Sequence, residues 1–381
     1  MQAIFYLFFS LLLIWDATIF LLLVASPFFS NRLRRRNHLP DILLLIPAHN
    51  EEMVIGHTLS SLKDCPARVV VIADHCTDRT LDIVKRAGFE AFIFDKGANS
   101  TKSKALSAAL QHYKNQHWRY LMVMDADNVL SANFWHLLPH VLALSPEVVQ
   151  VEVRPSNPGH SMTTKMITVI YAFLNRVIQR GRAVFGLSAN LCGTGMLFRK
   201  DILVHRAPWT EDMGLVEDIY YQIRLCEKNI PIHWYDCIWV LDEKPIALKS
   251  GVVQGSRWLR GRMAIAIECI SLLKRKPLFA ISVIWALLPK PVFWLAFISA
   301  LLNHMLCPFS WETMTPFLLF PWLAWIFPSL VFKPYRIGPI AVVFPFWQMG
   351  IQVMHLMQAI WDRGKGWRHT RHFGKGQDYI E

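Results

Sequence analysis

The chain has 381 residues, 53% of them hydrophobic, and a formal net charge of +12. This length suits one or two domains. The basic residues gather beside apolar segments and in the C-terminal tail, as topology signals and lipid-headgroup contacts require, so we expect no nucleic-acid partner. The seven cysteines form no Cys-x-x-Cys pair and no zinc-type spacing, which fits a reducing compartment.

Residues 1–30 are predicted to form an N-terminal transmembrane helix. Residues 1–29 carry one charged side chain, Asp16, and are long enough to cross a bilayer. They lack a basic start and a small-residue cleavage site, which argues against a cleaved signal peptide. An arginine-rich run at 31–36 follows and places the next part of the chain in the cytoplasm.

Residues 40–250 are expected to be a cytoplasmic domain in which strands and helices alternate. This alternation predicts an α/β fold with a mostly parallel sheet and ligands at the carboxyl ends of its strands. Asn50 is expected to be the N-cap of the first helix, with Glu51 and Glu52 in its first turn. The predicted strands are 42–46, 69–73, 91–94 and 120–124, and the predicted helices are 53–62, a segment ending near 87, and 102–113.

Two carboxylates, Asp125 and Asp127, directly follow the predicted strand 120–124. In an extended chain residues i and i+2 point to the same side, so both can converge on one point. Such hard oxygen ligands suit a magnesium or manganese ion that also takes phosphate oxygens. A capped strand-to-turn junction is the structural alternative. No Gly-x-Gly-x-x-Gly or Walker-type loop is present, so a nucleotide would be held by acids, a metal and basic side chains.

Other candidate residues lie at strand ends and in loops. Glu51 follows the first predicted strand and Asp74 ends the second, where acids would face a nucleotide. Lys102 precedes an apolar helix and could meet a diphosphate, although lysines are also common at helix starts on surfaces. Gly193 and Gly195 lie in a loop that enters a strand, where glycine permits close backbone approach to a sugar. A plain turn would explain this loop equally.

Two acidic pairs, Glu211-Asp212 and Glu217-Asp218, lie close together in the sequence. The second pair begins a helical pattern, so the helix dipole is expected to keep its carboxylates ionised and ready to accept a proton. The alternative for either pair is a first-turn acid that only stabilises its helix.

Gln254, Arg257 and Trp258 share one face of a predicted helix at 251–276, which we expect at the membrane surface. An arginine can grip phosphate oxygens bidentately, and the ring of a tryptophan offers a flat face to a sugar.

Residues 277–362 are predicted to form transmembrane and interfacial helices, with 338–361 among the spans, before a basic tail at 363–381. We therefore expect an integral membrane protein, in the cell inner membrane, with membrane lipids as partners and a cytoplasmic catalytic domain.

Together these motifs resemble glycosyltransferase family 2, in its membrane-embedded branch with cellulose, hyaluronan and poly-N-acetylglucosamine synthases. The resemblance covers roughly residues 40–262 and depends on the order and spacing of the motifs. It implies a GT-A-like nucleotide-sugar-binding domain. The matching segments are Pro47 to Glu52, Asp74 to Asp78, Lys102, Asp125 to Asp127, Gly193 to Gly195, Glu217-Asp218 and Gln254 to Trp258.

The resemblance also implies a role for each candidate. Asp218 would be the catalytic base, preferred to Asp212 because its distance along the chain to Gln254 suits the family pattern. Asp125 and Asp127 would hold the divalent cation, magnesium or manganese. The donor-binding residues would be Glu51, Asp74, Lys102, Asp125 and Arg257, and the acceptor-binding residues Gly193, Gln254 and Trp258.

The implied reaction is inverting transfer of a sugar from a nucleotide-diphosphate sugar, expected to be a UDP-sugar, to a growing polysaccharide or glycan. Transfer of a single sugar to a lipid is the alternative acceptor choice. A glycoside hydrolase would also use paired carboxylates but would need no diphosphate site. A membrane transporter or scaffold would explain the spans but not acids at successive strand ends.

Overall fold

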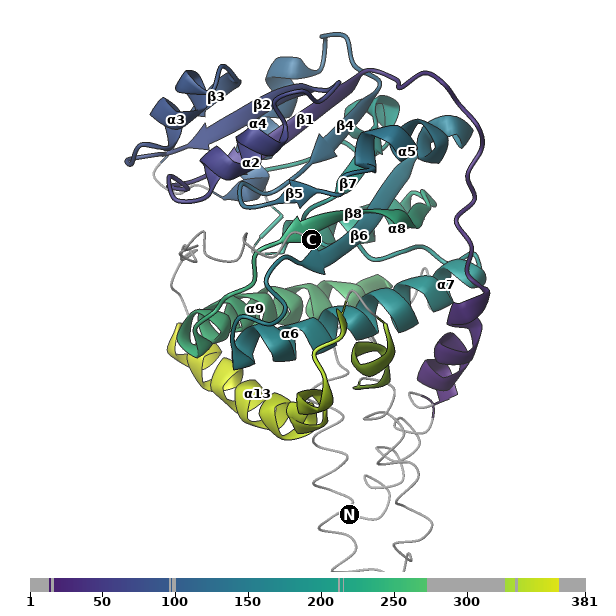
Figure 1. Ribbon diagram of the computed structural model, residues 1–381. Coiled ribbons are helices and arrows are strands. Elements are labelled where there is room, and N and C mark those ends of the chain that lie inside the picture. Colours follow the sequence, from purple (N-terminus) through teal and green to yellow (C-terminus); the bar gives the residue numbers. More distant parts are fainter. Residues whose placement is uncertain are drawn as a thin grey trace, which may run out of the picture.

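One eight-stranded sheet organises the part of the chain that the computed structural model describes, namely residue 14 and residues 17–95, 97, 101–211, 213–214, 216–272, 326–332 and 335–362 (Figure 1). The strand order is β3-β2-β1-β4-β7-β6-β8-β5. The strands are β1 (Ile42–Ala48), β2 (Arg68–Asp74), β3 (Glu90–Phe94), β4 (Tyr120–Val123), β5 (Val129–Leu130), β6 (Val148–Pro155), β7 (Met196–Arg199) and β8 (Ile232–Asp242).

The sheet is mixed rather than mostly parallel. Strands β1 to β4 pair in parallel, as the alternating pattern predicts, and so do β6 and β8. Strand β7 runs antiparallel to β4 and β6, and β5 runs antiparallel to β8. The N–H of Gly195 donates to the carbonyl of Val123 at 2.9 Å, so β7 starts where β4 ends and must run back along it.

Helices cover both faces of the parallel half, which explains why its strands read as continuous apolar runs. Leu43 and Leu45 face the core beneath α4 and α8, whereas Leu44 and Ile46 face the core beneath α2 and α5. The helices are α2 (Ile55–Ser61), α3 (Thr80–Arg86), α4 (Lys102–Tyr113), α5 (Phe134–Val141) and α8 (Glu217–Glu227), with short turns η1 (Ser26–Phe28), η2 (Leu142–Leu144) and η4 (Ile202–Arg206).

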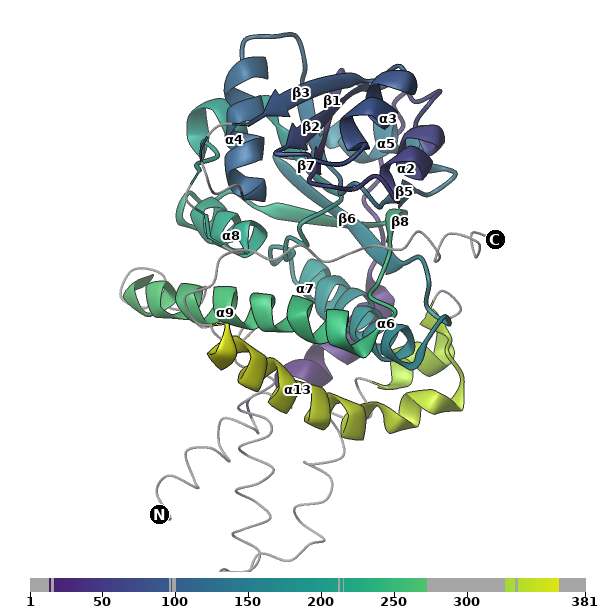
Figure 2. The ribbon, with the colours of Figure 1, turned by 90° about the vertical axis from the view of Figure 1, so that its left-hand side faces the viewer.

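A second set of helices lies beneath the sheet (Figures 1 and 2). Helix α6 (Met162–Phe173) continues through the π-helix η3 (Leu174–Gln179) into α7 (Arg180–Val184), and α9 (Leu248–Leu272) lies beside it. Helix α13 (Phe344–Trp361), which follows η6 (Pro339–Val343), packs against α9 and α6. A Cβ atom added at Gly255 would lie 2.2 Å from the ring of His355, so α9 and α13 approach closely at this glycine.

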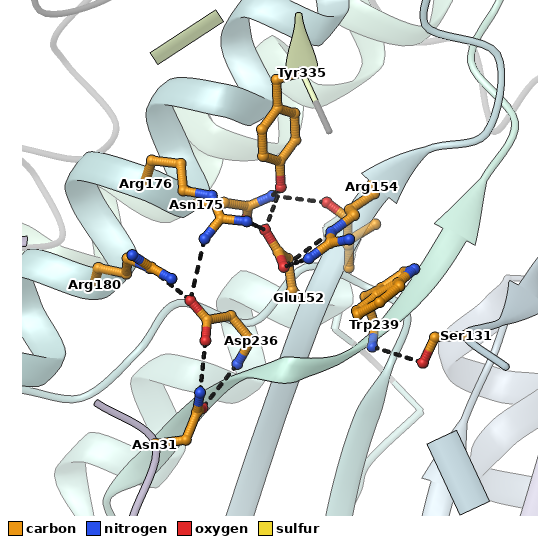
Figure 3. A network of polar contacts seen from close by, with 11 residues as sticks. Asn31, Ser131, Glu152, Arg154, Asn175, Arg176, Arg180, Asp236, Trp239 and Tyr335 are labelled. Carbon is orange, nitrogen blue, oxygen red and sulfur yellow. Dashed lines mark hydrogen bonds and ion pairs between the residues drawn. The ribbon is translucent and has the colours of Figure 1, made fainter. Parts of the chain in front are cut away.

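Buried charges join this helical layer to the sheet (Figure 3). The fully buried carboxylate of Glu152, on β6, pairs with Arg154 at 2.5 Å and with Arg176 of η3 at 3.1 Å. The hydroxyl of Tyr335 also donates to Glu152. The guanidinium of Arg154 stacks 3.7 Å from the ring centre of Trp239 on β8. Glu152 thus connects the sheet with η3 and the segment before α13.

Asp236 of β8 extends the same network. One of its carboxylate oxygens accepts from Arg180 at 2.5 Å and from Arg176 at 3.4 Å. The other accepts from Asn31 at 2.8 Å, and Asn31 accepts in turn from the N–H of Asp236 at 3.1 Å. The segment that precedes β1 is therefore fixed to the same sheet edge as α7.

Within the described residues, no helix is both long enough and apolar enough to cross a membrane. Residues 338–361, predicted among the transmembrane and interfacial helices, form η6 and α13, and α13 carries Gln348, Gln352, His355 and Gln358 among its apolar residues. Half of the predicted N-terminal span (residues 1–13, 15 and 16), residues 273–325 and the basic tail lie outside the described residues.

The prediction that Asn50 caps the first helix is wrong. Helix α2 begins at Ile55, and its N-cap residue Val54 has no side-chain cap. Asn50 has a φ of 56°, and its Oδ1 accepts from the N–H of Thr77 at 2.8 Å. A short amide side chain can bond a neighbouring loop as readily as a helix end. Here Asn50 joins the loops that follow β1 and β2.

Candidate active site

Asp125 and Asp127 lie in the loop at the carboxyl end of β4, where the parallel strands of the sheet place ligands. Asp127 is 6% exposed, whereas the side chain of Asp125 is 38% exposed. The N–H of Asp125 donates to Oγ1 of Thr194 at 3.2 Å. Asn128 donates to Asp127 at 2.9 Å and accepts from Thr194 at 2.5 Å. The loop containing Gly193 and Gly195 therefore holds the Asp-x-Asp turn in place.

Asn128 and Thr194 are positioning residues to which the sequence motifs assigned no role of their own. Asn128 directly follows the Asp-x-Asp motif and is fully buried, and Thr194 is 1% exposed between two glycines. Their adjacency to predicted motifs was the available signal. Their pairing across 66 positions exists only in the folded chain.

Lys102 gathers three parts of the predicted site around one ammonium group. Its Nζ donates to Asp125 Oδ1 at 2.5 Å and to the carbonyl of Gly193 at 2.8 Å, and it lies 3.6 Å from Glu217 Oε1. Burial alone would lower the pKa of Lys102, but the carboxylates of Asp125 and Glu217 outweigh it and raise this pKa. Lys102 therefore remains a cation between the Asp-x-Asp turn and α8.

Gly193 and Gly195 have different reasons to be glycine. Gly193 has a φ of +78°, and a Cβ there would lie 3.7 Å from Asp218 Oδ2 and 3.9 Å from Lys102 Nζ. It therefore leaves room directly beside the two charged groups. Gly195 has a φ of +64°, and a Cβ there would lie 2.8 Å from Val151, so its role is close backbone packing.

Asp218 lies in the first turn of α8, as predicted, but its ionisation differs from the expectation. Burial and then the adjacent carboxylate of Glu217 raise the pKa of Asp218 to about 7, against the opposing effects of the Ile219 N–H, Lys102 and Arg262. The helix dipole is expected to favour the ionised carboxylate, but desolvation by burial acts in the opposite direction and raises its pKa. A carboxylate with a pKa near neutrality is suited to general-base catalysis.

Helix α9 brings the 254–258 motif to this group. The guanidinium of Arg257 interacts with the carboxylates of Glu217, Asp125 and Asp218, which oppose the lowering of its pKa by burial. Gln254 and Trp258 lie on the same helix and are partly buried. The structure therefore brings Arg257 together with Asp125 and Asp218, although they are far apart in the sequence.

Glu51 and Asp74 lie at the neighbouring ends of β1 and β2. The N–H of Glu51 donates to Oγ1 of Thr80 at 2.8 Å. Asp74 is 6% exposed, and its Oδ1 contacts Nδ1 of His75 at 2.7 Å. This hydrogen bond and the carbonyl of Gly97 raise the pKa of His75. Contact of Asp74 with a nucleotide stays a prediction.

Two further predictions concern the alternative base and the metal site. Asp212, the alternative base, lies outside the described residues. In the part of the chain that is described, no cluster of three or more His, Cys, Asp or Glu side chains could hold a metal ion. A cation at Asp125 and Asp127 would therefore need further ligands from a bound molecule or water.

Comparison with known proteins gives a family match for the first part of this domain. The model of glycosyl transferase family 2 matches residues 44–206. A curated relative, the probable glycosyltransferase YdaM of Bacillus subtilis (strain 168), is 28% identical over 255 residues, which make up 62% of this chain and 60% of the relative. The chain thus spans less than two thirds of that relative's length.

Solved structures are similar at lower levels. S. aureus TarS 1–349, solved in complex with UDP-GlcNAc, gives a TM-score of 0.44 at 14% identity, covering 86% of this chain and 93% of that one. Glucosyl-3-phosphoglycerate synthase from Mycobacterium tuberculosis, solved with Mn2+, UDP and glucosyl-3-phosphoglycerate, gives 0.39 at 17% identity, covering 65% and 87%. The segment that the family 2 model matches takes in the Asp-x-Asp turn and the Gly193–Gly195 loop.

Proposed function

We propose that this protein transfers a sugar from a nucleotide-diphosphate sugar, a UDP-sugar, to a glycan acceptor at a membrane, with inversion at the anomeric carbon. The observation that carries this proposal is the convergence of Asp125, Lys102, Arg257 and Asp218 at one edge of the sheet, within and beside the segment that the family 2 model matches. Cations and a base with a pKa near 7 are the groups that such a displacement needs.

In the proposed mechanism, Asp218 accepts the proton of an acceptor hydroxyl as that hydroxyl attacks the anomeric carbon. Gly193 leaves space beside the carboxylate for the acceptor. Lys102 and Arg257 lie near the carboxylates of Asp125 and Asp218 and would stabilise the charge on the departing diphosphate. A single base without a protein nucleophile implies inversion, so an α-linked donor would give a β-linked product.

Asp125 and Asp127 fit a divalent cation, magnesium or manganese. Both come from one turn. Lys102 donates to Oδ1 of Asp125, and Asn128 donates to Oδ1 of Asp127. Two carboxylates with water and donor phosphates match the coordination that magnesium prefers. When bound, such a cation would neutralise charge on the diphosphate.

The membrane location of the reaction is supported by the sequence. The apolar segments at 1–30 and 277–362 flank the domain, and the arginine-rich run at 31–36 favours a cytoplasmic catalytic side at the cell inner membrane. A glycan acceptor that grows at this surface is our first choice, and a lipid that receives one sugar is the second.

The test is incubation of the full chain, in membranes or detergent, with a panel of nucleotide sugars and either cation. Release of nucleoside diphosphate identifies the donor, and the size of the product separates a glycan from a single-sugar lipid. We expect Asp218→Asn to lose about 10²–10⁴-fold in turnover while donor binding survives, because the base acts on the acceptor. Asp64→Asn, at an exposed position, is the control that should keep wild-type turnover.

Two results would refute the proposal. One is a wild-type protein that neither binds nor turns over any nucleotide sugar. The other is near-normal transfer by Asp218→Asn, which would remove this residue from the role of the base.

A further inference from the structure

Helix α9 passes directly over the start of α8. A Cβ added at Gly261 would lie 2.7 Å from Cγ2 of Val216, so the backbone of α9 packs directly on the Val216 side chain at this glycine. Val216 is the N-cap residue of α8 and immediately precedes Glu217 and Asp218. The residue that follows Gly261 on α9 is therefore held beside the proposed base.

That residue is Arg262, which no motif in the sequence singled out. Its guanidinium interacts with the carboxylate of Asp218 first, and then with Tyr171 and Cys192. Its Nε is buried and has no hydrogen-bond partner among the described residues. A buried guanidinium nitrogen without a partner is costly, and the favourable interaction with the carboxylate of Asp218 offsets part of this cost.

The charged and titratable groups that face Asp218 come from four parts of the fold. They are Glu217 on α8, Lys102 on α4, Cys192 in the loop before β7, and Arg257 and Arg262 on α9. Lys102 is shared between Asp125 and Glu217, and Arg257 interacts with Glu217 and Asp125 before Asp218. Arg262, by contrast, has Asp218 as its main acidic neighbour.

We propose that Arg262 is a positioning residue for the catalytic base: its positive charge keeps the carboxylate of Asp218 ionised beside the space that Gly193 leaves. This inference rests on the proposed function, since it assigns a partner to the base of that reaction. Without the positive charge of Arg262, Asp218 would lie next to Glu217, and its remaining cations, Lys102 and Arg257, also interact with Glu217 and Asp125. The proton would then be held more tightly, and the base would become competent only at higher pH.

The experiment compares pH profiles of kcat/KM for the acceptor at saturating donor and cation. The acidic limb is the part of the profile in which kcat/KM falls as the base becomes protonated. In Arg262→Gln this limb should move upward by about one pH unit, because a nearby opposite charge shifts the pKa of a carboxylate by about that much or more. Arg262→Lys keeps the charge and should stay near the wild-type limb. Arg260→Gln is the matched control on the same helix, since Arg260 donates to the carbonyl of Asp362 at 2.8 Å, and its limb should not move.

Calorimetric binding of UDP to each variant shows whether the site is still folded. An unmoved limb in an Arg262→Gln protein that binds UDP overturns the assignment, as does an equal shift in Arg260→Gln. If Arg262→Gln does not bind UDP, Arg262→Lys decides: an unmoved limb supports the role of the charge, and a shifted limb refutes it. A wild-type protein without transfer activity would refute the proposed function itself. Failure of the proposed function can therefore be distinguished from failure of the Arg262 assignment.

Discussion

Two adjacent carboxylates begin α8, and their mutual repulsion adds to the effect of burial on the pKa of the proposed base. Glu217 lies 3.6 Å from Lys102 and raises the pKa of Asp218. In Glu217→Gln this repulsion is lost, so the pKa of Asp218 should fall. The acidic limb of the pH profile should then move downward, opposite to the shift expected for Arg262→Gln. Kinetic pH profiles of the two variants, measured side by side, test both signs.

An upward or absent shift in Glu217→Gln would mean that another group produces the limb. The double variant Glu217→Gln, Arg262→Gln is a useful control. Its limb should lie between those of the single variants, because the two electrostatic effects on Asp218 have opposite signs.

Gly195 supports the site because its position has no room for a side chain. Its φ of +64° disfavours any side chain, and a Cβ would lie 2.8 Å from Val151. We expect Gly195→Ala to destabilise the fold by about 1–3 kcal/mol through strain and steric conflict. Urea unfolding measures this. Gly159→Ala, which has open space and no positive φ, is the control and should change little. Equal stabilities would mean that the loop can shift at no cost.

At the scale of elements, the helix α6–η3–α7 is fixed to the sheet by buried ion pairs. Glu152 is fully buried and is bound by Arg154, Arg176 and Tyr335 (Figure 3). Removing one partner of a buried pair leaves other charges without compensation, so Glu152→Gln should cost about 3–5 kcal/mol of stability. Denaturant titration of purified protein would measure the loss.

The matched control for that prediction is Asp41→Asn. Asp41 pairs with His117 at 3.0 Å, with both side chains mostly exposed, and exposed pairs contribute little. If the two variants lost equal stability, the network around Glu152 would not act as a tie between layers.

At the scale of the whole molecule, α9 connects the catalytic edge with α13. It carries Arg257 and Arg262 to α8 and packs Gly255 against His355 of α13. We expect Gly255→Ala to push the two helices apart and lower both stability and transfer, because the added Cβ would lie 2.2 Å from the imidazole. His355→Ala in the same chain should restore part of the loss, and this coupling can be measured as a double-mutant cycle.

Additive losses in that cycle would contradict the proposed contact. Protection of α13 amides from hydrogen exchange provides a second measurement. Those amides should exchange faster in Gly255→Ala and recover in the double variant.

Local patterns predicted the first half of the domain well. The helix 102–113 has the bounds of α4, and the predicted strands correspond to β1, β2, β3 and β4. Apolar runs of strand length bounded by turns are read directly, because burial of both sheet faces leaves little choice of residue. The antiparallel direction of strand β7 was not predicted. It depends on the hydrogen bond between Gly195 and Val123, which are far apart in the sequence.

The sequence by itself determined which carboxylates stand at a strand end and at a helix start, since Asp125, Asp127 and Asp218 follow from local motifs and their order. Only the tertiary structure decided how these groups act on one another. Lys102 lies against Asp125, and Arg262 against Asp218, because α4, α8 and α9 converge at one sheet edge. Ionisation and charge balance depend on burial and on distances between residues remote in sequence, and neither quantity is encoded in a local pattern.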